Sequence, residues 1–414
     1  MVERRTIWLT DQSISGSRTA GAGPGRKAAY DQLRMPAAVT QQDRVHLRRA
    51  LELAAGGRGQ VSPNPLVGAV LTRDGEAIGE GFHSELGGQH AEVAALEDCR
   101  ARGHEPSGAT LYVTLEPCAH QGRQPPCTDA ILAAGVTRVV IASEDPSDKA
   151  SGRGPGILRD EGVEVELANG EEATAARLLN QAFRKHSRTA RPLVLLKSAL
   201  SLDGRVATAG GDSRWISGEA SRALVHRWRA ECDAVCVGIG TALADDPLLT
   251  ARPVDVSARH APRQPARVVF DSEARLPLDS RLVGSIREAP LLVIASRAAP
   301  AERAEALEEA GANVIVCDGD PPDRVAAALA ELGRRETTSL LLEGGPTLAG
   351  SFLDAGEIDE LRLFIAPIVL GGAAAKPLAG GEGADLIADA TPALAVEWER
   401  SDGDLLVRAR LREW

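Results

Sequence analysis

The segment TLEPCAHQGRQPPC, residues 114–127, carries two cysteines and follows a short apolar run. Upstream, His90 begins the tripeptide His-Ala-Glu directly before an apolar helical pattern. One imidazole and two thiolates supply three of the four ligands of tetrahedral zinc, so we predict a zinc site at His90, Cys118 and Cys127. Three protein ligands leave one coordination position open for water, which is typical of catalytic sites.

Glu92 is the predicted proton shuttle of this site. It stands two residues after His90, near the expected helix start, and can reach the water without filling the open position. Pro117 fixes the backbone before Cys118, and a helix start at Cys127 would favour both thiolates. The alternative is that the cysteines are merely buried and the histidine lies on the surface. This alternative would not explain why His90, Glu92, Pro117-Cys118 and Cys127 occur in this order.

Strand and helix patterns alternate around this segment. The apolar runs Leu66–Leu71 and Ala77–Phe82 flank Asp74-Gly75, which predicts a hairpin. The other expected elements are helices at Ala91–Ala101 and Thr128–Ala134 and strands at Thr110–Leu115 and Thr137–Ala142. The alternation predicts an α/β layered domain.

A second α/β series follows a basic and polar stretch, Arg184–Pro192, where we place the domain boundary. Its expected strands lie near Leu193–Leu196, Ala234–Ile239, Arg267–Phe270, Leu291–Ala295, Asn313–Val316, Leu340–Leu342 and Leu361–Ile365, with helices at Ala301–Ala310 and Asp323–Leu332. The runs Val396–Trp398 and Leu405–Leu411 surround a turn and predict a C-terminal hairpin. We therefore predict one domain over residues 41–186 and a second over residues 187–414.

Residues 1–40 are polar and irregular, and we predict a disordered tail there. The chain has two methionines, Met1 and Met35, and a start at Met35 would remove most of this tail. The true N-terminus is therefore left open by the sequence.

Composition narrows the function classes. The 414 residues include 47 basic and 58 acidic ones, a net charge of −11, and 43% are hydrophobic. No apolar run approaches the roughly 20 residues of a membrane helix. Because phosphate attraction is mostly electrostatic, the negative charge argues against a general nucleic-acid binder. Six irregularly spaced cysteines and no recognisable secretory signal make the reducing cytoplasm the expected compartment.

The order His-x-Glu, Pro-Cys and a second Cys matches the signature of zinc nucleobase deaminases, with eight rather than two residues between the cysteines. With SPNPLVGAV at 62–70 and GEGFH at 79–83, this half closely resembles the deaminase half of the bifunctional riboflavin-biosynthesis deaminase–reductase. The resemblance implies a cytidine-deaminase-like three-layer α/β/α domain. It also implies that Asn64 and His83 touch the substrate, although a turn-forming asparagine and a structural histidine explain them nearly as well.

The second half carries KSALSLDGR at 197–205, DSRWIS at 212–217, GTALADDPLLTAR at 240–252 and EGGPTL at 343–348. Together these motifs resemble the reductase half of the same family, whose fold is similar to that of dihydrofolate reductase. EGGPTL follows a strand and opens a helix, where free backbone N–H groups bind phosphate oxygens. It lacks the Gly-x-Gly-x-x-Gly fingerprint, and by itself a plain strand–helix turn explains it at least as well.

The resemblance implies the residues of the reductase site. NADPH would be bound by Ala199, Trp215, Thr241, Asp245, Ser272, Gly345, Pro346, Thr347, Leu348, Ala349, Gly350 and Ser351. The substrate would be bound by Ser213, Arg229, Leu249, Arg252 and Glu343. The two arginines suit a phosphate, although a single arginine is more often a solvated surface charge, and Trp215 alone would equally suit a core. Spacing names neither a proton donor for the reduction nor an arginine for the 2′-phosphate of NADPH.

The implied function is a two-step enzyme with zinc and NADPH as cofactors. The first domain would hydrolyse the 2-amino group from 2,5-diamino-6-ribosylamino-4(3H)-pyrimidinone 5′-phosphate. The second domain would reduce the ribosyl chain of the product to ribityl. The expected partner is this small phosphorylated pyrimidine, without nucleic acid or membrane, and a homo-oligomer is left open.

Two other functions fit parts of the sequence. A deaminase acting on nucleic acid predicts a basic groove and stacking aromatic residues, whereas aromatic residues are 3% of this chain. An inactive, zinc-stabilised binding protein predicts the loss of Glu92 or of the cofactor loop, and both are present. The fusion of the two motif sets favours the two-step enzyme.

Overall fold

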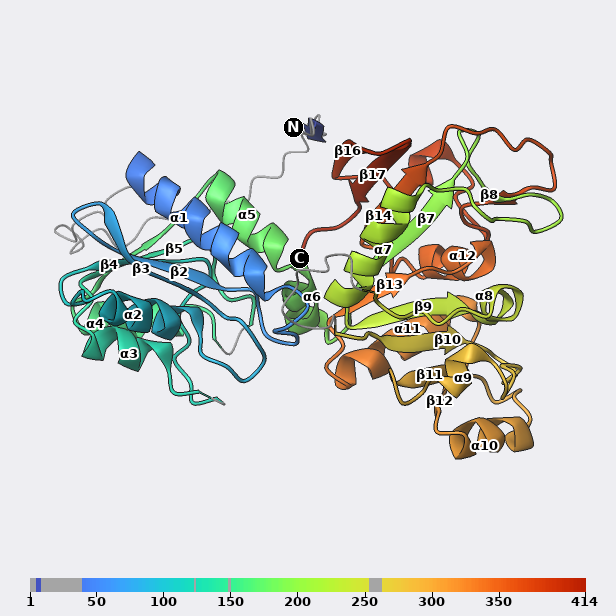
Figure 1. Ribbon diagram of the computed structural model, residues 1–414, viewed down its shortest axis with the longest axis horizontal. Coiled ribbons are helices and arrows are strands. Elements are labelled where there is room, and N and C mark those ends of the chain that lie inside the picture. The colour runs from blue at the N-terminus through green and yellow to red at the C-terminus, as the bar shows by residue number, and fades with distance from the viewer. Residues whose placement is uncertain (1–4, 9–38, 123, 148–149, 253–262) are drawn as a thin grey trace, which may run out of the picture.

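The computed structural model describes residues 5–8, 39–122, 124–147, 150–252 and 263–414. Two α/β units, each built on its own large sheet, lie side by side with helix α6 (Gln181–Thr189) between them (Figure 1). The predicted α/β class is confirmed for both halves. None of the helices in the described part of the chain is both long and apolar enough to cross a bilayer.

The first sheet has five strands in the order β3-β2-β4-β5-β6. Strand β2 pairs antiparallel with β3 and β4, and the remaining pairs are parallel. The predicted hairpin is present, with Asp74 and Gly75 at positive φ in its turn, as the Asp-Gly pair favours. The strands are β2 (Gly68–Arg73), β3 (Glu76–Phe82), β4 (Thr110–Val113), β5 (Arg138–Ile141) and β6 (Glu164–Leu167).

Helices cover both faces of this sheet and make the three layers visible in Figure 1. On one face lie α1 (Gln41–Ala54) and α5 (Glu171–Leu179), and on the other lie α2 (Ala91–Ala101), α3 (Cys127–Ala133) and α4 (Arg153–Asp160). Helix α2 packs closely on β3 because Gly79 and Gly81 leave room, since a Cβ at either would clash with backbone atoms of α2. This close packing fixes the start of α2, which carries the predicted zinc ligand and proton shuttle.

The second sheet has ten strands in the order β1-β16-β17-β14-β7-β13-β9-β10-β11-β12. From β14 to β12 all neighbours are parallel, whereas β17, β16 and β1 add antiparallel pairs at one end. The strands are β1 (Arg5–Trp8), β7 (Leu193–Leu200), β9 (Ala234–Gly238), β10 (Ala266–Phe270), β11 (Leu291–Ala295), β12 (Asn313–Val316), β13 (Ser339–Leu342), β14 (Glu360–Ile365), β16 (Ala395–Ser401) and β17 (Asp404–Arg410). The predicted C-terminal hairpin is therefore confirmed as β16 and β17.

Alternate residues of the parallel strands enter two apolar layers, as expected for a sheet buried on both faces. Helices α7 (Glu219–Glu231), α8 (Ile239–Asp245), α9 (Arg281–Gly284) and α10 (Ala301–Glu309) contribute to one layer. Helices α11 (Pro321–Arg334) and α12 (Pro346–Asp354) contribute to the other. A short ribbon of β8 (Arg205–Ala207) and β15 (Lys376–Pro377), with the 3-10 turns η1 (Ala55–Gly57) and η2 (Ile387–Asp389), completes the described elements.

The basic stretch chosen as a domain boundary carries two buried cations. Arg184 and Lys185 of α6 are 2% and 1% exposed. Lys185 Nζ lies 2.7 Å from Asp359 Oδ2 in the second unit, and Arg184 NH2 lies 2.8 Å from Glu144 Oε1 in the first. Arg184 Nε also donates to the carbonyl oxygen of Trp414 at 2.6 Å. Two consecutive buried cations thus hold α6 to both units.

Four residues of the predicted disordered tail belong to a strand. Residues Arg5–Trp8 form β1 and pair antiparallel with Ala395–Trp398 of β16. The prediction of a wholly irregular tail therefore does not hold for β1. The rest of that tail, up to residue 38, and the alternative start at Met35 lie outside the described residues.

Candidate active sites

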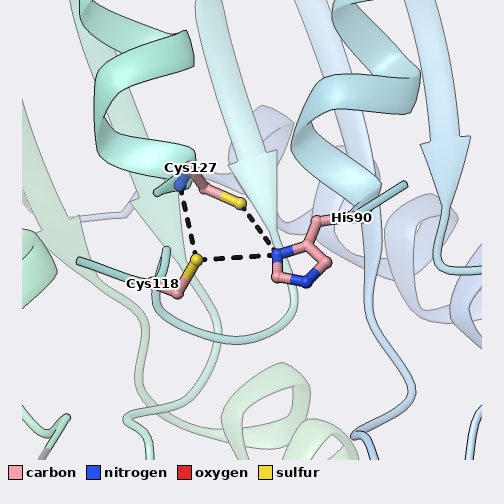
Figure 2. A group of neighbouring side chains, drawn as sticks. All are labelled: His90, Cys118 and Cys127. Atoms are coloured by element: carbon pink, nitrogen blue, oxygen red, sulfur yellow. Dashed lines mark hydrogen bonds between the residues drawn. The ribbon is translucent and has the colours of Figure 1, made fainter. Parts of the chain in front are cut away.

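The three predicted zinc ligands converge although they come from separate elements. His90 Nδ1 lies 3.1 Å from Cys127 Sγ and 3.5 Å from Cys118 Sγ, and all three donor atoms lie within 4.8 Å of one another (Figure 2). Tetrahedral zinc, with bonds of about 2.0–2.3 Å to nitrogen and sulfur, separates such atoms by roughly 3.5–3.8 Å. The donor set therefore fits a zinc ion with little movement.

The local backbone favours a thiolate at Cys118. Cys127 is the first residue of α3, and its N–H donates to Cys118 Sγ at 3.3 Å. Hydrogen bonding with Cys127 and then with His90 lowers the pKa of Cys118 to about 4. This sulfur is thus in the form that binds metal at neutral pH.

Glu92 lies in the first turn of α2 and is 3% exposed. Burial raises the pKa of its carboxyl to about 6, partly opposed by the neighbouring His90. A carboxyl with this pKa both accepts and releases protons near neutral pH. Burial in the first turn after His90 and this pKa support the assignment of Glu92 as proton shuttle, which stays a prediction.

Asn64 and His83 lie next to the zinc ligands. The His83 ring meets the His90 ring edge to face, with centroids 5.5 Å apart. His83 Nδ1 donates to the carbonyl oxygen of Gln89 at 2.8 Å, which leaves Nε2 to accept from Asn64 Nδ2 at 3.1 Å. Burial lowers the pKa of His83, consistent with the neutral ring that this pattern requires. His83 therefore contacts the zinc ligand His90 and holds the Asn64 amide, while the contact of either residue with a substrate stays a prediction.

The strand-to-loop turn before Cys118 is supported by residues to which sequence reasoning gave no role. Both carboxylate oxygens of Glu116 accept from the backbone N–H of Gly152, at 3.0 and 3.2 Å. Gly154 then passes so close to Pro117 that a Cβ would clash with the Pro117 carbonyl oxygen. Gly152 and Gly154 thus support the turn that carries Cys118.

In the second unit, the predicted cofactor residues follow the carboxyl ends of neighbouring parallel strands, where open α/β sheets bind ligands. Thr241 follows β9, Ser272 follows β10, and Gly345 follows β13. Gly345 and Thr241 are neighbours, since a Cβ at Gly345 would lie 3.6 Å from Thr241 Oγ1. No side chain caps the start of α12 at Gly345, so backbone N–H groups there can bind phosphate. These features fit the phosphates of a dinucleotide.

Arg229 and Glu343 form a bidentate pair rather than two separate substrate ligands. Arg229 Nε and NH2 lie 2.7 and 3.0 Å from the two carboxylate oxygens of Glu343. Arg229 NH1 also donates to the carbonyl oxygen of Thr250 at 3.2 Å, and Arg252 two residues later is exposed. Arg229 is therefore already paired with a carboxylate, whereas Arg252 is open to a ligand, and contact of either arginine with the substrate stays a prediction.

Lys197 joins this pair, and sequence reasoning gave it no role. Its Nζ lies 3.9 Å from Glu343 Oε2, and its side chain is 18% exposed. Burial lowers the pKa of Lys197, which eases release of a proton. A lysine inside the apolar strand LVLLKSAL of β7 is the signal that could have identified it.

The other residues predicted for the reductase site differ in their exposure. Trp215 is 74% exposed, so its interpretation as a core residue is wrong, and the guanidinium of Arg222 lies 4.6 Å from its ring centroid. Arg214 NH2 lies 3.0 Å from Asp245 Oδ1 and ties this loop to α8. Ser213, Asp245 and Thr347 are exposed, while Ala199, Pro346 and Ser351 are half-buried.

Four predicted contact residues are buried. Leu249, Leu348, Ala349 and Gly350 pack in the interior, the last against the backbone of Gly380. A bound ligand would reach them only through their backbone. The open part of the cofactor loop is therefore its first turn, from Gly345 to Thr347.

Two known family models match separate parts of the chain. A model of the RibD C-terminal domain matches residues 192–405, and a model of the cytidine and deoxycytidylate deaminase zinc-binding region matches residues 40–143. Riboflavin biosynthesis protein RibD of Actinobacillus pleuropneumoniae is 40% identical over 370 residues, covering 89% of this chain and 95% of that protein. RibD of Mycobacterium tuberculosis is 41% identical over 324 residues, covering 78% and 84%.

Solved structures are similar over the same extent. RibD of Acinetobacter baumannii has a TM-score of 0.78 at 36% identity, covering 89% of this chain and 99% of that chain. A diaminohydroxyphosphoribosylaminopyrimidine deaminase/5-amino-6-(5-phosphoribosylamino)uracil reductase of Thermotoga maritima has a TM-score of 0.75 at 34% identity, covering 89% and 98%. The cytidine-deaminase-like and reductase folds expected for the two halves are thereby confirmed.

The close contact between Gly154 and Pro117 gives a test of the zinc site. We expect Gly154→Ala to displace the Pro117–Cys118 turn, because the added methyl overlaps a backbone oxygen. Purified protein should then contain markedly less than one zinc per chain by elemental analysis. Gly156→Ala in the same helix is the control, since nothing lies within 4 Å of a Cβ there. Equal zinc content in both variants would contradict this role.

Proposed function

The chain belongs to the RibD family of riboflavin-biosynthesis enzymes, and on this premise we propose that its two sites act in succession on one phosphorylated pyrimidine. A zinc-dependent deaminase unit is joined in one chain to an NADPH-dependent reductase unit. The first step of the proposal is hydrolysis of the 2-amino group of 2,5-diamino-6-ribosylamino-4(3H)-pyrimidinone 5′-phosphate. The second is reduction of the ribosyl chain of the product to ribityl.

The observation that carries the first step is the three-donor cluster beside a buried carboxyl. Zinc held by His90, Cys118 and Cys127 would supply an activated water at the ring carbon. Glu92 takes the proton of that water and delivers it to the departing nitrogen, which leaves as ammonia. Asn64 is the proposed contact of the pyrimidine, and His83 positions it, because His83 Nε2 holds the Asn64 amide while Nδ1 is bonded to the carbonyl oxygen of Gln89.

The second step is supported by the Lys197–Glu343–Arg229 cluster, in which Lys197 of β7 lies level with the carboxyl end of β13. NADPH supplies the hydride, so the protein must position the sugar and provide one proton. We assign that proton to Lys197 Nζ, whose pKa is lowered by burial and whose orientation is set by Glu343. Arg252, which is exposed, is the candidate for the substrate phosphate.

A reducing compartment, the cytoplasm, is part of the proposal. All six cysteines are free, and four of them, Cys99, Cys232, Cys236 and Cys317, are buried without a zinc-site partner among the described residues. The other two must remain thiolates to bind zinc. The expected partner is the small-molecule substrate, and a homo-oligomer is compatible with it.

Deamination should depend on the carboxyl of Glu92. We expect Glu92→Gln to lower ammonia release from the diaminopyrimidine phosphate by about a hundredfold or more, because general acid–base catalysis contributes that much. Zinc content should be retained, since Glu92 is not a ligand. The control is Glu97→Gln on the exposed face of the same helix. Ammonia release at the native rate by Glu92→Gln would refute the assigned proton route.

Reduction should depend on the ammonium of Lys197. We expect Lys197→Met to slow NADPH oxidation with the deaminated substrate by about a hundredfold, while ammonia release in the first step is unchanged. Lys376→Met serves as the control, because this exposed lysine lies on β15. If Lys197→Met reduced the sugar within about twofold of the native rate, another group would have to supply the proton.

A further inference from the structure

Resting on the proposed reductase function, we infer that Arg324, together with Ser272, recognises the 2′-phosphate of NADPH and sets the preference over NADH. Arg324 lies in the first turn of α11, 52 residues from Ser272 in sequence. Its NH1 nevertheless donates to Ser272 Oγ. A cation is thus joined to the one residue after β10 that the sequence assigned to the cofactor.

The direction of the bound dinucleotide follows from the sheet order. The nicotinamide must lie near Lys197 on β7, because hydride passes to the substrate there. The pyrophosphate suits the uncapped start of α12 after β13, beside Thr241 after β9. In the order β7-β13-β9-β10, the adenosine end then continues toward β10. Strands are spaced by about 4.8 Å, so Ser272 lies roughly 10 Å beyond the glycine turn, within reach of the adenosine ribose.

Arg324 is held in place but is not neutralised. Its NH2 donates to the carbonyl oxygen of Gly319 at 3.0 Å, and its buried Nε has no hydrogen-bond partner. Within the described residues, no carboxylate lies at ion-pair distance from its guanidinium, and Asp318, the residue before Gly319, is paired with Arg297 at 2.6 Å. The guanidinium is therefore pre-positioned by neutral oxygens, and its charge is left for an anion.

Among the residues that the structure describes, no carboxylate at the end of β10 is directed at the proposed ribose position, where it would favour NADH. NAD-binding sheets use a carboxylate to hold the ribose 2′-hydroxyl. Here the carboxylate at the end of β10, Asp271, is 0% exposed, and its Oδ2 accepts from the N–H of Leu276 at 2.8 Å. Glu273 is directed toward Arg275, with Oε2 3.8 Å from Nε. A serine hydroxyl and a guanidinium remain for the ribose, which suits a phosphate ester rather than a hydroxyl.

The test is a comparison of nucleotide binding by the full-length protein, measured by calorimetry without substrate. We expect Arg324→Gln to raise the Kd for NADPH about tenfold to a hundredfold, the effect of losing charged hydrogen bonds, and to change the Kd for NADH less than about twofold. Arg324→Gln should also bind adenosine 2′,5′-bisphosphate more weakly than the native protein does, whereas its affinity for 5′-AMP should be unchanged. Arg324→Lys should recover part of the loss.

Arg334→Gln is the matched control, since it removes the same charge from the last turn of the same helix, where Arg334 is paired with Glu331. Equal weakening of NADPH and NADH by Arg324→Gln would show a merely structural role and overturn the inference. Unchanged affinity for both nucleotides would overturn it as well. Native protein that binds neither nucleotide would instead contradict the reductase half of the proposed function, which separates the two failures.

Discussion

Three donor atoms from three places in the chain share one small volume, and the chemistry of the first unit depends on that convergence. His90 stands before α2, Cys118 in a loop after β4, and Cys127 at the start of α3. Backbone contacts that only glycine permits hold these elements, with α2 against β3 and Gly154 against Pro117. The same packing buries Glu92 and brings its pKa near neutrality. Metal binding and proton transfer are thus consequences of one set of close contacts.

The two units are joined by buried charge rather than by a flexible linker. Lys185 is paired with Asp359, and Arg184 contacts Glu144 together with the carbonyl oxygen of Trp414. Removing one partner of a buried ion pair is costly, because the other charge remains without water or a counter-ion. The units that carry the deaminase and reductase sites are therefore joined by contacts that resist their separation. Such a junction suits two successive reactions on one substrate skeleton.

The sequence alone predicted the features that depend on short motifs and local apolar patterns. It missed the features that depend on contacts between residues far apart in the chain. The zinc ligands and Glu92 were found because their motifs are short and chemically specific. The α/β class followed from alternating apolar patterns, which tertiary packing preserved. By contrast, the buried contacts of Arg184 and Lys185 could not be predicted, because their partners lie up to 230 residues away. The pairing of Arg229 with Glu343, the nearby Lys197 and the contact of Arg324 with Ser272 likewise join residues that no spacing rule connects.

The most direct measurement of the central claim is X-ray absorption at the zinc edge on the purified protein, combined with metal analysis. We expect one zinc per chain, with one nitrogen and two sulfur neighbours at about 2.0–2.3 Å and one further light atom in the open position. A fully active protein without zinc, or a zinc surrounded by four protein ligands, would contradict a catalytic metal site built from His90, Cys118 and Cys127.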